Sequence, residues 1–171
     1  MSIVLDGSNL TTTGVINSAT AVASTSGTSI DFTSLPSGLK RITVMYAGLS
    51  TTGTSDILVR LGTSGGIVST GYLGTAILSS SGGTAVTNFT TGFGIFQNAQ
   101  GTAWVGHGLM TICFLGSNIW TATSIVGESD TARGSYFGGS VTLSAAVTTL
   151  RITTSGGTDT FDAGSINILY E

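Results

Sequence analysis

The chain has 171 residues and a net charge of −3, and 8% of its residues are charged, against about 25% in an average globular domain. This length suits one domain that buries a core without disulfides or metal ions. Of the five basic residues only Lys40 and Arg41 are neighbours, which excludes a basic stripe for nucleic acid and a polybasic membrane patch.

Residues 1–27 differ from the rest of the chain, because they are small, rich in hydroxyl groups and free of aromatic side chains. We predict an extended N-terminal arm that lies on a neighbouring subunit, adding a strand or threading between subunits; the alternative is a flexible arm. The apolar residues expected to fasten this assembly arm are Ile3, Val4, Leu5, Leu10, Val15 and Ile16.

The start of the arm has neither the basic segment nor the sustained apolar run of a secretory signal. No run in the chain reaches the roughly 18 apolar residues of a membrane-spanning helix. We therefore expect synthesis in a cytoplasm and no membrane insertion. A surface so poor in charge also suits a protein covered largely by copies of itself or by a larger assembly, since charge usually keeps a monomer in solution.

From residue 28 onward, short runs of β-branched and aromatic residues bounded by Gly, Ser, Asn or Asp predict strands. Residues 28–35 alternate between apolar and polar side chains. Residues 39–49 are apolar on both faces, which predicts a central strand covered on two sides. Residues 56–62 predict a further strand, and residues 67–78 predict one broken strand.

The longest predicted strand covers residues 102–116. Its glycines, Gly106 and Gly108, are expected to let a large side chain or a backbone segment lie close. The dipeptide Ser117–Asn118 predicts a tight turn, so that residues 119–127 pair back as a hairpin.

About eight to ten short strands are spaced as in sandwiches and barrels, with no helix of crossover length between them. We therefore predict an all-β fold, an antiparallel β-sandwich that is jelly-roll-like and covers residues 28–171. The extended N-terminal arm of residues 1–27 precedes this domain.

Two residues are candidates for a nucleophile or a general base. His107 lies between glycines, and no G-x-S-x-G motif is present, which favours a solvent-facing or interface histidine. A Ser-His-Asp arrangement stays open, because its members meet in space rather than in sequence. Cys113 is the only cysteine and lies in an apolar run, which predicts a buried small hydrophobe; the alternative is a reactive thiol.

The acidic residues are scattered singly or in glycine-rich turns. Asp159 and Asp162 are predicted to accept hydrogen bonds from backbone N–H groups in the turn before the last strand. A calcium site and an active site are the alternatives, although the D-x-D-x-D-G pattern of calcium loops is absent. No cofactor is expected, because no phosphate-binding or cysteine-metal motif occurs.

The most charged loop follows residue 127. Its Glu128, Asp130, Arg133 and Tyr136 are the candidates for a ligand-facing surface that would bind a host glycan. The aromatic residues that could form a sugar platform lie mostly in apolar strands, which favours core or interface packing. These residues are Tyr72, Trp104, Trp120 and Tyr136.

Two stretches carry a resemblance to a known family. They are residues 30–67, IDFTSLPSGLKRITVMYAGLSTTGTSDILVRLGTSGGI, and residues 148–171, TTLRITTSGGTDTFDAGSINILYE. With GLMTI and NIWTATSIVG between them, they resemble structural proteins of tailed bacteriophages and prophages. In that family a β-sandwich module of this kind often ends a tail-fibre or virion-surface polypeptide.

The resemblance implies a non-enzymatic virion protein, made in the host bacterial cytoplasm, that forms a homo-oligomer, with a trimer favoured, and contacts other phage structural proteins of the capsid or tail. Only about 27 residues precede the sandwich, which leaves room for an arm but not for a fibre shaft. We therefore expect a small surface protein: a head decoration, cement or knob protein, or a short fibre tip. The alternative is a tail-fibre module that binds a host surface glycan.

Overall fold

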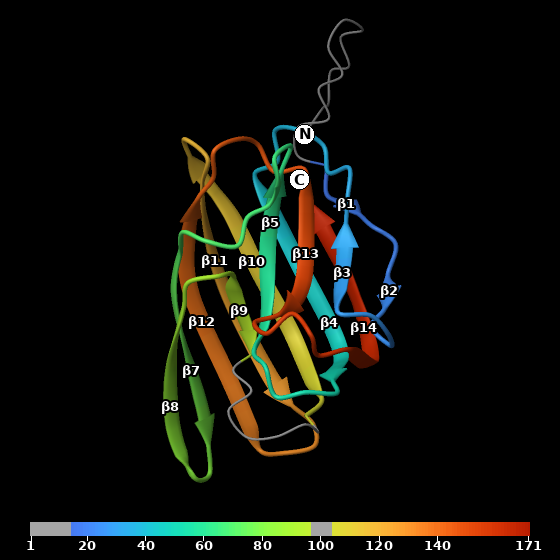
Figure 1. Ribbon diagram of the computed structural model, residues 1–171, viewed down its shortest axis with the longest axis vertical. Helices are drawn as coiled ribbons and strands as arrows, with labels where there is room; N and C mark the ends of the chain where they lie inside the picture. The colour runs from blue at the N-terminus through green and yellow to red at the C-terminus, as the bar shows by residue number, and fades with distance from the viewer. Residues whose placement is uncertain (1–14, 97–103) are drawn as a thin grey trace, which may run out of the picture.

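A computed structural model describes residues 15–96 and 104–171, and these residues form two antiparallel sheets that pack face to face (Figure 1). No helix occurs in the described ranges, so none of them holds a helix that could cross a membrane. The predicted all-β sandwich is confirmed. The chain crosses repeatedly between the two sheets, while β10, β11 and β12 follow one another within one sheet.

The large sheet has nine strands in the order β1-β14-β4-β10-β11-β12-β7-β8, with β2 also paired to β14. Its strands are β1 (Asn17–Ser18), β2 (Val22–Ala23), β4 (Arg41–Thr51), β7 (Tyr72–Ser80), β8 (Gly83–Phe89), β10 (Gly106–Gly116), β11 (Ile119–Glu128), β12 (Arg133–Thr142) and β14 (Phe161–Tyr170).

The small sheet has five strands in the order β3-β13-β5-β6, with β9 also paired to β5. It lies in front of the large sheet in Figure 1. Its strands are β3 (Ser29–Phe32), β5 (Ile57–Thr63), β6 (Gly66–Ile67), β9 (Phe93–Phe96) and β13 (Thr149–Thr154).

Alternation along the strands of the large sheet places one set of side chains in the core and the other in solvent. Val44 of β4 is the Cα partner of Met110 of β10, and both are fully buried. Their neighbours Thr43 and Thr111 are also partners and face outward. The prediction that β4 is central is confirmed, because it pairs with β14 and β10. The prediction that both its faces are covered is wrong, since the small sheet covers only one face.

An aromatic cluster joins the two sheets. Phe93 of β9 is fully buried, and its ring meets Tyr72 of β7 edge to face with ring centres 5.0 Å apart. Phe137 of β12 lies 6.1 Å from Phe93 and 5.7 Å from Phe89. Because β9 belongs to the small sheet and β7 and β12 to the large one, this cluster is a main contact between the layers.

The predicted hairpin around Ser117 and Asn118 is confirmed. Both residues have positive φ, 48° and 58°, as both central residues of a type I′ turn require. The turn joins β10 to β11, which pair along almost their whole length. The close approach predicted at Gly106 and Gly108 is also confirmed: a Cβ at the first would overlap the Trp104 ring, and one at the second would overlap the backbone oxygen of Ile125.

The prediction of one broken strand over residues 67–78 is wrong. Ile67 ends β6 in the small sheet, whereas Tyr72 begins β7 in the large sheet. The buried Tyr72 hydroxyl donates to the Val68 oxygen at 3.2 Å and accepts from Leu61 N–H at 2.8 Å. These two bonds hold the corner at which the chain passes from β6 in the small sheet to β7 in the large sheet. Burial raises the pKa of this phenol to about 12.

The described part of the N-terminal arm, residues 15–27, adds strand to the large sheet of its own chain. Its strands β1 and β2 pair with β14, and the fully buried Ser24 bonds the Ala163 oxygen through its hydroxyl at 2.8 Å. Val15 and Ile16 are more than half exposed. The other predicted arm residues, Ile3, Val4, Leu5 and Leu10, lie outside the described residues.

Candidate functional site

The structure does not bring the four residues of the predicted ligand-facing loop onto one surface. Glu128 and Arg133 point between the sheets and form an ion pair, with Nη2 and Oε2 3.0 Å apart. Asp130 accepts a hydrogen bond from Val105 N–H at 2.9 Å and so ties the loop after β11 to the segment before β10. Tyr136 points to the opposite side, the solvent face of the large sheet, where its side chain is exposed.

The Glu128 carboxylate is fully buried, and the Arg133 side chain is 14% exposed. Beyond this ion pair, neither carboxylate oxygen has a hydrogen bond to another described residue. Burial raises the pKa of Glu128, and the positive charge of Arg133 offsets only part of this effect. Burial of such an ion pair costs desolvation energy. The Glu128 carboxylate is not accessible to a ligand, whereas Arg133 also lines an open groove at the β7–β8 hairpin.

The raised pKa of Glu128 predicts a specific pH dependence of stability. Folded Glu128 binds its proton at higher pH than the unfolded chain does, whose reference pKa is 4.5. The contribution of Glu128 to folding therefore falls as the pH rises from 4.5 through the raised pKa. We expect Glu128→Gln to remove this slope, so that the stability difference between variant and wild type changes between pH 4.5 and neutral pH. Urea unfolding across that range checks this; a constant difference would contradict it.

His107 makes hydrogen bonds that oppose a role as general base. Its Nδ1 accepts from Gly48 N–H at 3.2 Å, and its Nε2 lies 3.1 Å from Ser129 Oγ. In the neutral ring the proton must then sit on Nε2, which donates to the serine. Activation of a serine needs the reverse arrangement, with a free lone pair on Nε2 and an N–H on Nδ1. The His107–Ser129 pair therefore links the start of β10 to the loop after β11, with the ring nitrogen as donor to the serine.

The glycine-rich turn before β14 is held by one of its two aspartates. Asp159 Oδ2 accepts from Ser55 N–H at 2.8 Å, and its carboxylate lies directly against Gly53. Asp162 lies in β14 and is exposed. The predicted backbone contact is thus confirmed for Asp159 alone. Within the described residues, no three His, Cys, Asp or Glu side chains come together.

Removal of the Asp159 carboxylate is expected to loosen the link between this turn and residues 53–55. We expect Asp159→Ala to lower the free energy of unfolding by about 1–2 kcal/mol, because a half-buried N–H loses its acceptor. Asp162→Ala is the matched control and should change it by less than about 0.5 kcal/mol. Thermal unfolding of both variants checks this. Equal losses, or a stabilisation of the wild type by added calcium, would contradict it.

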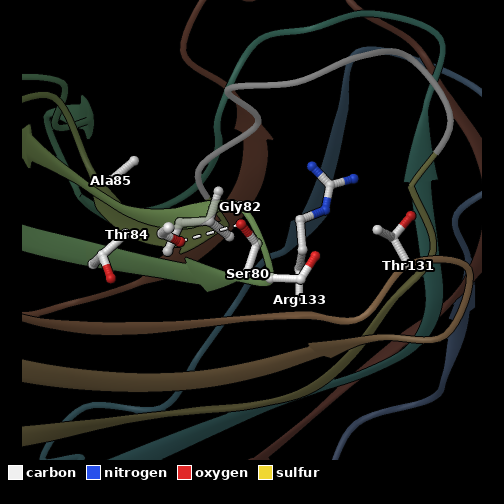
Figure 2. Close-up of a pocket in the computed structure, with 9 residues that line it drawn as sticks. Ser80, Gly82, Thr84, Ala85, Thr131 and Arg133 are labelled. Carbon is white, nitrogen blue, oxygen red and sulfur yellow. Dashed lines mark hydrogen bonds between the residues drawn. The ribbon is translucent and has the colours of Figure 1, made fainter.

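Aromatic residues do not gather into a sugar platform. Tyr72, Trp104 and Trp120 are buried, and of the four candidates only Tyr136 is exposed. An open groove of about 550 Å³ lies at the β7–β8 hairpin (Figure 2). Ser80 and Arg133 are among the residues that line it, and the Ser80 hydroxyl donates to the Gly83 oxygen at 3.1 Å. No aromatic residue occurs among its described lining residues.

The prediction that Cys113 is buried is wrong. Its side chain is exposed, because residue 113 falls on the solvent-facing set of β10 between the buried Ile112 and the half-buried Phe114. Its Cα partners are Arg41 and Thr121 on the neighbouring strands. The apolar run that suggested burial belongs to a strand that carries apolar residues on both faces.

The most distinctive surface is the solvent face of the large sheet between β4 and β8, here called the outer face. One apolar residue from each of five adjacent strands projects from it, and strand register places these residues directly beside one another. Each is between 44% and 63% exposed. This apolar ridge consists of Leu109, Ile125, Tyr136, Ile77 and Val86, in order across the sheet.

Two rows of small residues flank the apolar ridge, each two residues away along the strands. The glycine row is His107, Gly127, Gly134, Ser79 and Thr84. The threonine row is Thr43, Thr111, Thr123, Gly138, Thr75 and Asn88. These rows and the ridge carry no Asp, Glu, Lys or Arg.

The exposed side of the small sheet differs from the outer face, because it carries charge. There Arg151 forms a bidentate pair with Asp31, both contacts 2.7 Å long, and Arg60 is their neighbour across the strands. On the outer face Arg41, the first residue of β4, is exposed beside Cys113 of β10 and forms an ion pair with Glu171. The apolar ridge and its two flanking rows carry no charged residue. Large exposed apolar patches often coincide with contacts between molecules.

Sequence reasoning did not find the apolar ridge. Each of the five strands contributes one residue to the ridge, and β7 and β10 each carry a further exposed leucine, Leu73 and Leu115. Single exposed apolar residues are normal for a protein surface. Only the register between strands shows that five of them are neighbours. The sequence pattern that could have indicated the ridge is that β7, β10 and β11 each carry apolar residues on both faces.

Comparison of the chain with protein families, with curated proteins and with solved structures finds no match.

Proposed function

We propose that the protein is a non-enzymatic structural protein of a tailed-phage virion. It would be a small oligomeric surface component, such as a head decoration, cement or knob protein or a short fibre tip, docked through its N-terminal arm. The resemblance of residues 30–67 and 148–171 to virion proteins supports the phage context and favours a trimer. In this proposal the chain is made in the host cytoplasm and then joins capsid or tail proteins.

The observation that carries the proposal is the apolar ridge of the outer face with its uncharged flanking rows. The ridge is exposed across five strands, whereas the charged residues of the small sheet lie on the other side of the molecule. A protein that works as a free monomer gains solubility from charge on its broadest surface. A face of this composition is suited to being covered by other protein chains.

The arrangement of the titratable residues also favours a structural role. The His107 ring donates to Ser129 and cannot activate it in that state. Asp159 binds a backbone N–H, and Glu128 is paired with Arg133 inside the sandwich. Each of these side chains has a structural partner, which accounts for its position without chemistry.

Incorporation into particles tests the proposal. We expect the chain to be present in purified virions of the phage that encodes it, as measured by quantitative mass spectrometry. A full-length Val4→Asp/Leu10→Asp variant should keep its strand signal in circular dichroism yet be depleted from particles. The control is Leu115→Asp, which changes an equally apolar, exposed residue outside the arm. A chain missing from purified virions would refute the proposal.

A second candidate function is a tail-fibre module that binds a host surface glycan, and the open groove at the β7–β8 hairpin favours it. The groove offers the hydroxyls of Ser80, Thr84 and Thr131, which are groups that bond sugars. Binding to host polysaccharide that is lost in Thr131→Val and kept in Tyr136→Phe would support this function. No binding to any glycan of the host surface would remove it.

A further inference from the structure

We propose that two copies of this chain pair through their outer faces, with the apolar ridge of each copy seated on the glycine row of the other. This inference rests on the proposed function, since it names the partner of the surface on which that function depends, but it assigns that surface to a two-fold pair instead of the trimer that the resemblance implies. It is a statement about the isolated chain as well, so it can fail while the virion role holds.

The outer face contains both a ridge and the hollows that fit it. Gly127 follows Ile125 by two positions on β11, and Gly134 precedes Tyr136 by two positions on β12. A side chain added at Gly127 would meet nothing within 4 Å, so open space lies above it. A side chain added at Gly134 would lie 3.2 Å from the backbone oxygen of Val126. Because neither glycine has a side chain, the surface beside Ile125 and Tyr136 is lower than these two ridge residues.

The pairing uses a two-fold axis that runs across the strands, midway between the apolar ridge and the glycine row. Rotation about this axis places the ridge of one copy over the glycine row of the other, and each strand lies opposite the same strand of the second copy. Ile125 of one copy then lies over Gly127 of the other, and Tyr136 lies over Gly134. Both contacts occur twice, as an isologous interface requires. Sheets that pack in this way lie about 10 Å apart.

Charge favours a second copy over a charged partner. Each chain carries a net charge of −3, so two copies repel weakly at a distance. On contact, however, the ridge and its flanking rows present no charged side chain to one another. A basic or acidic partner would find no complementary group on the ridge or its flanking rows, whereas the identical rows of a second copy leave no charge buried without a partner.

The area is sufficient for a stable pair. The face spans six strands at about 4.8 Å spacing and three rows about 7 Å apart, which with the marginal side chains gives about 700 Å². Stable interfaces bury about 800 Å² on each partner. The ridge supplies an apolar centre, and the threonine row supplies a polar rim, which is the usual arrangement of an interface.

Sedimentation equilibrium of the full-length chain over a range of concentrations tests the pairing. We expect twice the chain mass of 17.1 kDa, with dissociation on dilution. Ile125→Lys, which places a charge at the centre of the face, should weaken pairing at least tenfold. Leu115→Lys is the control, because Leu115 is 70% exposed and lies off the ridge; it should leave the dissociation constant within about threefold.

A second pair of variants distinguishes a specific interface from non-specific hydrophobic association. Gly127→Thr fills the hollow opposite Ile125 and should weaken pairing at least tenfold, although it adds a strand-forming residue. Gly138→Thr is its control, since Gly138 is equally open but lies in the threonine row. Circular dichroism and thermal unfolding should show all four variants folded.

Four results would overturn the pairing. They are a monomer up to millimolar concentration, a trimer of the wild-type chain, pairing that survives both Ile125→Lys and Gly127→Thr, and pairing that is lost in Gly138→Thr but kept in Gly127→Thr. The virion proposal fails separately, by absence of the chain from particles.

Discussion

Replacing Phe93 by alanine is expected to lower the free energy of unfolding by about 3–5 kcal/mol, the range for removing a buried aromatic ring. Phe93 is fully buried, and its ring contacts Tyr72 and Phe137. Because Phe93 belongs to the small sheet and both neighbours to the large sheet, the cavity would open between the layers. Chemical denaturation followed by tryptophan fluorescence measures this loss.

Leu73→Ala is the control for Phe93→Ala. Leu73 is the neighbour of Tyr72 on β7, but its side chain is 71% exposed. Its removal should change the free energy of unfolding by less than about 0.5 kcal/mol, as for other exposed positions. If Phe93→Ala cost no more than Leu73→Ala, the aromatic cluster would not be the contact that joins the sheets.

Gly108→Ala is expected to cost about 3 kcal/mol, the upper part of the range for overpacking. A Cβ at this position would overlap the backbone oxygen of Ile125, and backbone cannot move aside as a side chain can. The same Cβ would lie 3.2 Å from the Tyr46 hydroxyl, which bonds the Ile125 oxygen at 3.3 Å and lies 3.1 Å from Ser124 Oγ. The substitution thus strains one strand pair and disturbs a buried hydroxyl.

Gly127→Ala provides the comparison for Gly108→Ala on the adjacent strand. An added Cβ at Gly127 meets no atom within 4 Å, and alanine restricts the unfolded chain more than glycine does. We expect a gain of up to about 1 kcal/mol, measured at a concentration where the chain is monomeric. Similar losses in both variants would contradict the assignment of Gly108 as the site of close approach.

The architecture could be predicted from sequence features that span only a few residues. Strand alternation and the Ser117–Asn118 turn depend on neighbouring residues alone, and the structure confirms both the hairpin and the sandwich. The corner between β6 and β7 was missed because it depends on the Tyr72 hydroxyl reaching Leu61, a contact between residues 11 positions apart. Alternation alone does not show where a strand leaves its sheet.

The two-residue period of a β-strand could have excluded part of the predicted ligand-facing loop. Arg133 and Tyr136 are three positions apart, and in one continuous strand an odd separation places side chains on opposite faces. β12 begins at Arg133, so the two residues could not share a surface. The burial of Glu128 and the neighbours of Tyr136 required the register of β11 and β7, which no single segment of the sequence contains.

The two edges of the large sheet differ in the length of their outermost strands. At one edge β1 and β2 cover β14, while at the other β8 pairs only with β7 among the described strands. β8 has no proline or charged residue, the usual means of discouraging further strand addition. A further strand would find seven residues to pair with on β8 but only two each on β1 and β2. The large sheet therefore offers a long template for strand addition on one side and very short ones on the other, which directs edge-to-edge growth to β8.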